Sequence, residues 1–183
     1  MLKQQKKILV LSLAGLALVA LILFPILKDA EIGSELKAKD PARYEMVMQR
    51  YNQAKKILSK DAKDTDGLVR LGTAYEEFGD DDMAISKYKE ALAIDKANIM
   101  PWTNLAAIYK KRGKYEDAKN AYMQAIEIFP NDTQSYINLG NLYMDYNGGE
   151  LDKVLEILGQ GIEKTGDEAI KGVRDALEKM KSK

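Results

Sequence analysis

The side chains that could do chemistry in this chain are carboxylates, amides and hydroxyls, because histidine and cysteine are both absent. Their absence excludes Ser-His-Asp and Cys-His catalysis, thiolate or imidazole metal sites, and disulfides. The densest carboxylate run is Asp80-Asp81-Asp82. It lacks the spaced ligands of a calcium loop, and it stands at an expected helix start, where carboxylates cap free amides. The sequence therefore predicts no metal, no cofactor and no catalytic residue.

The composition is that of a mainly globular chain, with 183 residues of which 46% are hydrophobic and 31% are charged. The formal net charge is zero. Because Lys3, Lys6 and Lys7 stand at the N-terminus without an acid, the remainder is mildly acidic. A mildly acidic domain has no electrostatic reason to bind nucleic acid, so we expect no nucleic-acid partner.

A long apolar stretch separates a basic tail, residues 1–7, from the rest of the chain. Residues 8–27 read ILVLSLAGLALVALILFPIL and carry no charge. Twenty residues of helix rise about 30 Å, the thickness of the hydrocarbon core of a bilayer. We expect a transmembrane anchor with a cytoplasmic N-terminus and the following domain outside the cytoplasm, most simply at a bacterial inner membrane. A cleaved signal peptide is the alternative, although the stretch is long for one and lacks a clear small-x-small cleavage site.

From residue 65 onward the chain repeats itself every 34 residues. Leu71-Gly72 is followed at this spacing by Leu105-Ala106 and then by Leu139-Gly140. Further positions recur at the same spacing: Tyr75, Tyr109 and Tyr143; Ala84 and Ala118; Tyr88 and Tyr122; Ala91 and Ala125. Small residues at fixed places suit close helix approach, and the aromatic residues would fill the space between helices.

This pattern resembles the tetratricopeptide repeat, in which an aromatic residue, Leu-Gly, Tyr, Gly, Ala, aromatic, Ala and Pro stand at fixed offsets. The resemblance implies an all-α fold, a right-handed superhelix of antiparallel helix pairs, here preceded by a single transmembrane helix. We divide the chain on this basis as follows: a tether or anchor extension, 28–40; a degenerate half-repeat or cap helix, 41–64; three repeats, 65–98, 99–132 and 133–168; and a C-terminal cap helix, 169–183. The third repeat carries a two-residue insertion at Asn147-Gly148-Gly149.

In this family the first helix of each unit lines the concave face, and the resemblance places the binding residues there. Asparagine amides could hydrogen-bond the backbone of an extended peptide, since each offers a donor and an acceptor. Methionine would adapt to varied partner side chains. The predicted partner-binding residues are Asn104, Asn138, Asn141, Arg70, Lys111, Met100, Ile137 and Met144.

The function that this organisation predicts is a non-enzymatic, membrane-anchored scaffold that binds a protein or peptide, with an envelope assembly or secretion complex as the setting. The alternative is a small-ligand carrier or a carboxylate-based enzyme. A deep closed pocket with convergent carboxylates would favour that alternative. The sequence leaves the partner and the oligomeric state open.

Overall fold

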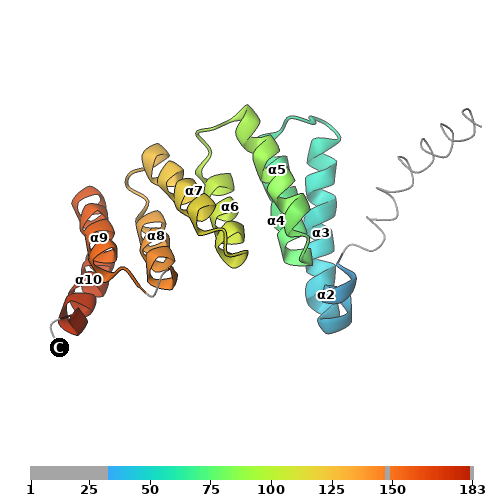
Figure 1. Cartoon of the computed structure of the whole chain (residues 1–183). Helices are drawn as coiled ribbons and strands as arrows, with labels where there is room; N and C mark the ends of the chain where they lie inside the picture. The colour runs from blue at the N-terminus through green and yellow to red at the C-terminus, as the bar shows by residue number, and fades with distance from the viewer. Residues whose placement is uncertain (1–32, 147–148, 182–183) are drawn as a thin grey trace, which may run out of the picture.

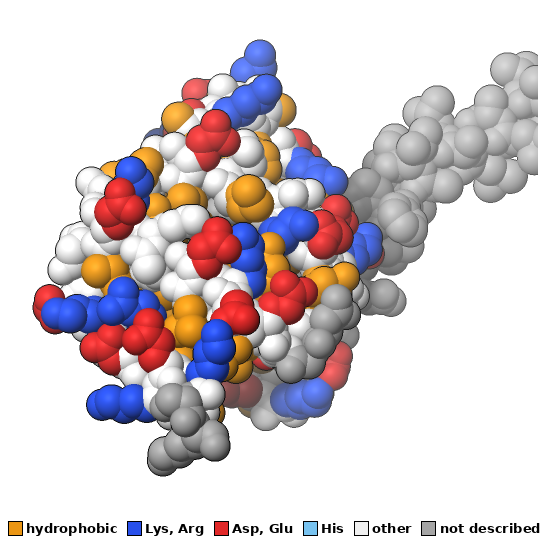
Figure 2. Space-filling view, turned by 60° about the vertical axis from the view of Figure 1, so that its left-hand side comes forward, with side chains coloured by type: hydrophobic (Ala, Val, Ile, Leu, Met, Phe, Trp, Pro, Cys, Tyr) orange, Lys and Arg blue, Asp and Glu red, His pale blue; other side chains and the backbone are white. Residues whose placement is uncertain are grey.

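The protein is an array of helices, seen in a computed structural model that describes residues 33–146 and 149–181. The described residues form nine helices and no strand (Figure 1). The helices are α2 (Ser34–Lys39), α3 (Pro41–Leu58), α4 (Thr65–Phe78), α5 (Asp81–Ile94), α6 (Ile99–Lys111), α7 (Tyr115–Ile128), α8 (Thr133–Asp145), α9 (Leu151–Thr165) and α10 (Glu168–Lys181). On the face seen in Figure 2, acidic and basic side chains are interspersed with small hydrophobic patches.

Three helix pairs, α4–α5, α6–α7 and α8–α9, form the middle of the array. Four of their six helices start with a side-chain cap: Asp64, Asp80, Asn98 and Asp132 each accept a hydrogen bond from a backbone amide of the helix that follows. Gly79 and Gly113 end the first helices of two pairs with φ of 87° and 69°, a backbone conformation that favours glycine. The predicted all-helical solenoid is confirmed, while the right hand of the superhelix stays a prediction.

Close helix approach depends on the small residues that recur in the sequence. Ala84, Ala91, Ala118 and Ala125 are fully buried. At Gly72 an added Cβ would lie 2.6 Å from Cε1 of Tyr88, so the tyrosine ring lies directly on the glycine backbone. The small residues of the repeat pattern therefore lie where neighbouring helices pack closely.

The hydrophobic interior divides into two clusters that meet at α6. One cluster extends from α3 through α5 and includes Leu105 and Ile108 of α6. The other begins at Ala106 and continues to Ile170 of α10. Trp102 and Tyr109 are only partly buried and pack against both clusters. Tyr109, which the sequence indicated as a core residue, is thus half-buried at the junction between two cores.

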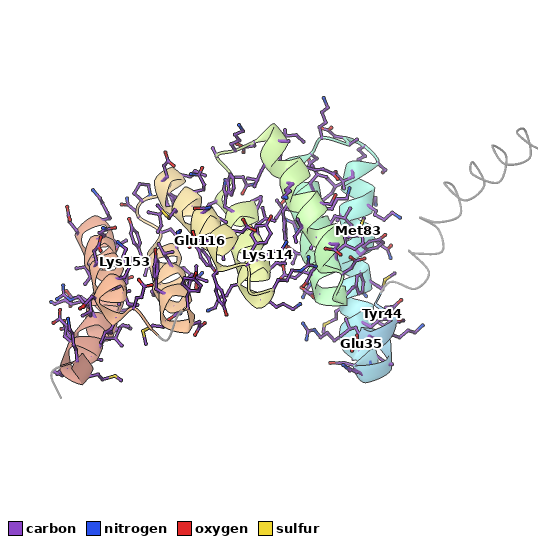
Figure 3. The ribbon with its side chains drawn as sticks, viewed as in Figure 1. Glu35, Tyr44, Met83, Lys114, Glu116 and Lys153 are labelled. Atoms are coloured by element: carbon purple, nitrogen blue, oxygen red, sulfur yellow. The ribbon has the colours of Figure 1, made fainter. Side chains whose placement is uncertain are left out.

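The two ends of the array differ from the sequence expectations in detail. Residues 34–39, predicted as part of a tether, form α2, which packs on α3, and Leu36 contacts the first core cluster. Tyr44, near the base of α3 (Figure 3), packs with its ring 5.9 Å from that of Phe78. At the other end α10 covers α9 as the predicted cap helix, but of its residues only Ile170 is fully buried.

The predicted localisation requires a correction. It placed a single transmembrane helix at residues 8–27 and the repeats outside the cytoplasm, and those residues lie outside the described part of the chain. Across residues 33–146 and 149–181, no helix combines the length and the apolar character needed to cross a bilayer. The predicted transmembrane localisation is therefore withdrawn, since no helix of the described residues supports it.

Candidate functional site

The first helices of the three pairs, α4, α6 and α8, carry the predicted binding residues. Helix α4 contacts α6 directly, although α5 stands between them in the sequence. The Nζ of Lys110 on α6 lies 2.7 Å from Oδ2 of Asp145 on α8. The first helices are therefore neighbours along one side of the array, which we call the first-helix face.

A hydrogen-bonded network stands on this face, centred on a tyrosine of a second helix. Tyr88 of α5 is fully buried, yet its hydroxyl lies 3.2 Å from Oγ1 of Thr73 and donates to Oε2 of Glu76 at 3.1 Å. The side chain of Asn104 on α6 lies near this hydroxyl and acts to lower its pKa. The hydrogen bonds therefore join α4 to α5, and Asn104, one of the predicted contacts, lies beside them.

Burial changes the acid–base behaviour of this network. Partial burial, followed by the nearby carboxylate of Asp81, raises the pKa of Glu76, while the hydrogen bond from Tyr88 acts in the opposite direction. Burial also raises the pKa of the Tyr88 hydroxyl well above its ordinary value. Tyr88 therefore stays neutral, and Glu76 is the member of the network that titrates more readily.

The other two predicted amides lie on α8, and their surroundings differ. Asn138 is half-buried, and its Oδ1 accepts a hydrogen bond of 2.9 Å from Nε2 of Gln134. Asn141 is exposed. The side-chain N–H group of Asn138 and the whole amide of Asn141 are thus the parts of these residues that a partner could reach.

The predicted cations are already engaged in ion pairs within the chain. Arg70 is exposed and pairs with Asp66 one turn earlier, at 2.6 Å. Lys111, also exposed, reaches Oδ1 of Asp81 at 3.0 Å. Arg112 contacts the same carboxylate at 3.4 Å. Because exposed ion pairs are weak, a partner could compete for either cation, but both would have to exchange an existing contact.

The predicted apolar contacts also separate into two kinds. Met100 and Met144 are 55% and 39% exposed, so both thioethers are accessible. Ile137 is half-buried and packs against the second core cluster. The structure places all eight predicted residues on first helices, and it leaves Asn141, Met100 and Met144 the most accessible of those without an internal ion pair.

Comparison with known families identifies the repeats. Three tetratricopeptide-repeat models match residues 68–98, 100–132 and 121–158.

The chain is a tetratricopeptide-repeat protein.

Among its relatives, the photosystem I assembly protein Ycf3 of Acaryochloris marina is 30% identical over 109 residues. The match covers 56% of this tetratricopeptide-repeat chain and 64% of Ycf3. Among solved structures, MamA has a TM-score of 0.59 and 23% identity, with 81% of this chain and 89% of MamA covered. The first tetratricopeptide-repeat domain of RPAP3 (Spaghetti), bound to the HSP90 peptide SRMEEVD, has a TM-score of 0.55 and 18% identity. The match covers 67% of this chain and 97% of that domain. At these identities the structural matches show the fold.

Sequence reasoning missed the parts of the tetratricopeptide-repeat structure that depend on pairs of positions. It interpreted Tyr88 as a core residue and did not connect its hydroxyl with Glu76 and Asn104. The available signal was Gly72, whose missing side chain leaves room for the ring of Tyr88 to pass between helices. It also missed two open grooves between successive second helices, of about 470 and 630 Å³.

The grooves bear on the enzyme alternative for this tetratricopeptide-repeat protein. Both grooves are open, and they are lined by aliphatic, aromatic, amide and a few charged side chains. Across the described part of the chain, no group of three or more carboxylates is placed to hold a metal ion. The described structure therefore offers the carboxylate-enzyme hypothesis no site of the kind that would favour it.

Proposed function

We propose that this chain is a protein-interaction scaffold that binds an extended peptide segment of a protein partner along the first-helix face. The observation that carries the proposal is the row of amides on α6 and α8. Asn104 lies beside the Tyr88 network, and Asn138 accepts a hydrogen bond from Gln134, so one of the three amides is oriented before a partner arrives. Pre-oriented donors and acceptors reduce the entropy lost on binding.

The remaining contacts follow from exposure and charge. Asn141 supplies an unhindered amide, and Met100 and Met144 supply adaptable apolar contacts. Arg70 and Lys111 contribute where a partner carboxylate displaces an internal one, and Ile137 contributes only its exposed edge. The charge pattern favours a mixed-charge peptide, since Glu76 and Glu77 end α4 whereas Lys110 and Lys111 end α6.

Relatives support this class of function. The family architecture serves protein–protein interaction and assembly, and the RPAP3 domain was solved with a bound peptide. Ycf3 is by its name an assembly protein. This scaffold has no need of a cofactor, a metal or a catalytic residue, and we propose that it uses none.

The test is site-specific photo-crosslinking with the full chain. A photoreactive residue replaces Asn141 in one variant and, as a control, the exposed Asn52 of α3 in another. We expect a crosslinked partner from position 141 but not from position 52. The crosslinked segment, made as a peptide, should bind the Asn141→Ala variant about three- to tenfold more weakly than the parent, the usual value of one hydrogen bond. Equal crosslinking from both positions, or unchanged affinity, would exclude the first-helix face.

A further inference from the structure

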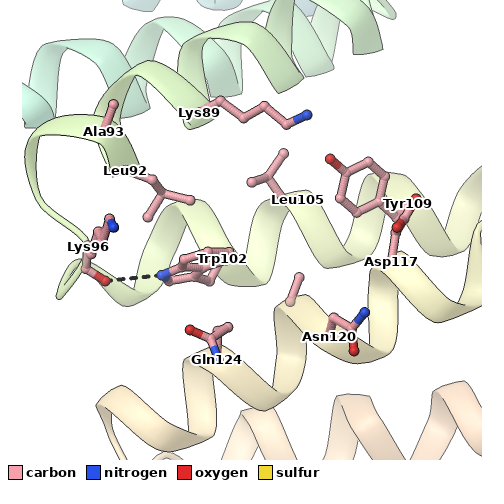
Figure 4. Close-up of a pocket in the computed structure, with 11 residues that line it drawn as sticks. Lys89, Leu92, Ala93, Lys96, Trp102, Leu105, Tyr109, Asp117, Asn120 and Gln124 are labelled. Atoms are coloured by element: carbon pink, nitrogen blue, oxygen red, sulfur yellow. Dashed lines mark hydrogen bonds between the residues drawn. The ribbon is translucent and has the colours of Figure 1, made fainter.

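A second interaction surface lies on the side of the array formed by second helices. It is a groove between α5 and α7, floored by α6, with a volume of about 470 Å³ (Figure 4). Trp102, Leu105 and Tyr109 of α6 form the floor of this α5–α7 groove. They stand at positions i, i+3 and i+7, so the floor extends for about two helical turns, or roughly 10 Å.

The floor is largely apolar, and the indole N–H group within it already has a partner. The Nε1 of Trp102 donates to the backbone oxygen of Lys96 at 3.1 Å, which fixes the indole at one end of the groove (Figure 4). Trp102 and Tyr109 remain only partly buried. Tryptophan and tyrosine are the residue types that most often dominate binding energy at protein interfaces.

The two walls of the groove carry different charges. Lys96 lies beside Trp102 at one end, and Lys89 extends toward Tyr109 at the other (Figure 4). Within residues 33–146 and 149–181, neither lysine forms an ion pair with a carboxylate. The α7 wall instead presents Asp117 and the amides of Asn120 and Gln124. The unpaired positive charge is therefore confined to the α5 wall.

The neighbouring groove provides an internal comparison. The α7–α9 groove has a volume of about 630 Å³ and is floored by Leu139 and Tyr143. Its two rim lysines are both paired on their own helices, Lys119 with Glu116 and Lys153 with Glu156 at 2.7 Å (Figure 3 labels Glu116 and Lys153). It also lacks a tryptophan. The combination of an indole floor and unpaired cations thus belongs to the α5–α7 groove.

We propose that the α5–α7 groove binds an amphipathic helix of a partner protein that carries acidic residues along one edge. Apolar side chains at i, i+3 or i+4, and i+7 would cover the two-turn floor, as in other helix-in-groove complexes. Lys96 lies at the Trp102 end of the floor and Lys89 toward the Tyr109 end, about two helical turns away, so two carboxylates seven residues apart on the partner helix meet both. Asp117 on the opposite wall repels an acidic edge and sets the orientation of the helix. This surface is distinct from the first-helix face.

The test uses the single tryptophan of the chain, which lies in the groove floor. The probe is a synthetic amphipathic helical peptide with leucines at i, i+3, i+4 and i+7 and glutamates at two edge positions seven residues apart. We expect it to shift the emission of Trp102 in the full chain and to protect the indole from quenching by acrylamide. A matched peptide with lysines in place of the glutamates should bind more weakly.

Charge exchange then locates the contact. The double variant Lys89→Glu/Lys96→Glu should lose about tenfold in affinity for the glutamate peptide and gain affinity for the lysine peptide. The control is Lys119→Glu/Lys153→Glu, which alters the α7–α9 groove and should bind the glutamate peptide like the parent.

Four results would overturn the proposal. The first three are binding of both peptides with equal affinity, equal losses in the two double variants, and binding without any change in Trp102 emission. The fourth is loss of the emission shift in Asn141→Ala, because the peptide would then be bound on the first-helix face.

Discussion

At the scale of single residues, the contact between Gly72 and Tyr88 links the repeat pattern to the candidate site. The ring of Tyr88 lies against the glycine backbone, and its hydroxyl emerges among Thr73, Glu76 and Asn104. A side chain at position 72 would displace the ring and, with it, the hydroxyl that bonds Thr73 and Glu76 beside Asn104. One missing Cβ thus supports both the packing of the helix pair and the hydrogen bonds next to a predicted binding residue.

Gly72→Ala should therefore destabilise the protein. The added Cβ would lie 2.6 Å from a ring atom of a fully buried tyrosine, and overpacking of this kind costs about 1–3 kcal/mol. The control is Gly172→Ala on α10, where nothing lies within 4 Å of the new Cβ. There the loss of glycine flexibility should stabilise the helix by about 0.5–1 kcal/mol. Thermal unfolding followed by circular dichroism measures both, and equal effects would contradict the packing described.

Glu76 gives the network a pH dependence with a definite sign. Because its pKa in the folded state is raised above the ordinary glutamate value of 4.5, folding favours the protonated form. The contribution of Glu76 to stability is therefore fully present below about pH 4.5 and is lost as the pH rises through the folded-state pKa. Glu76→Gln keeps an acceptor for Tyr88 without the charge. The melting temperature of this variant should exceed that of the parent by about 2 °C at neutral pH, and the difference should shrink toward pH 4.5. A constant difference across that range would argue against burial as the cause.

The sequence predicted these residues unequally. The 34-residue spacing was sufficient to place Asn104, Asn138 and Asn141 on first helices, because position within a repeat determines the helix face. The pair of Arg70 with Asp66 is an i,i+4 pair on one helix and could have been predicted from the spacing. The pair of Lys111 with Asp81 could not, because it joins residues 30 positions apart in the chain. Long side chains have many rotamers, and their partners depend on the angle between helices, which the repeat pattern does not specify.

At the scale of elements, the C-terminal helix protects the end of the array through one main contact. Ile170 of α10 is fully buried, and it lies close to Gly161 of α9. Val173 and Met180 of the same helix remain 46% and 69% exposed. The sequence predicted this cap helix but not how little of it is buried, because no helix follows α10 within the described residues to cover its outer part.

Ile170→Ala should accordingly destabilise the C-terminal end by about 2–5 kcal/mol, the cost of truncating a fully buried aliphatic side chain. Val173→Ala is the matched control, and it should cost less than about 1 kcal/mol because the side chain is nearly half exposed. Hydrogen exchange would localise the effect, with faster exchange in α9 and α10 and unchanged protection in α4. Comparable losses for the two variants would show that α10 packs differently.

At the scale of the whole molecule, the division of the core at α6 is the main departure from a uniform solenoid. The first cluster contains Leu105 and Ile108, the second begins with Ala106, and Trp102 and Tyr109 bridge the two. The sequence predicted equivalent repeats, since residues 65–98 and 99–132 match at most positions. It could not predict the division, because the packing between repeats depends on helix angles rather than on the residue types that recur.

Unfolding in denaturant should therefore begin at this division. In repeat arrays each unit is stabilised by its neighbours, so a weaker junction separates before the helices melt. The emission of Trp102 should shift at a lower urea concentration than the loss of helical circular dichroism. The control is Phe78→Trp in a Trp102→Phe background, which places the reporter inside the first cluster and should follow the dichroism signal. Coincident transitions for both reporters would show a single cooperative core.

The ion pairs between helices have a mechanical consequence. Arg50 meets Glu77 at 2.7 Å, Lys111 meets Asp81 at 3.0 Å, and Lys110 meets Asp145 at 2.7 Å, so each pair fastens one helix to another near the ends of first helices. The attraction between partly exposed charges weakens as dissolved salt screens it. We therefore expect the angles between neighbouring helices to become more variable as ionic strength rises, while every helix stays intact.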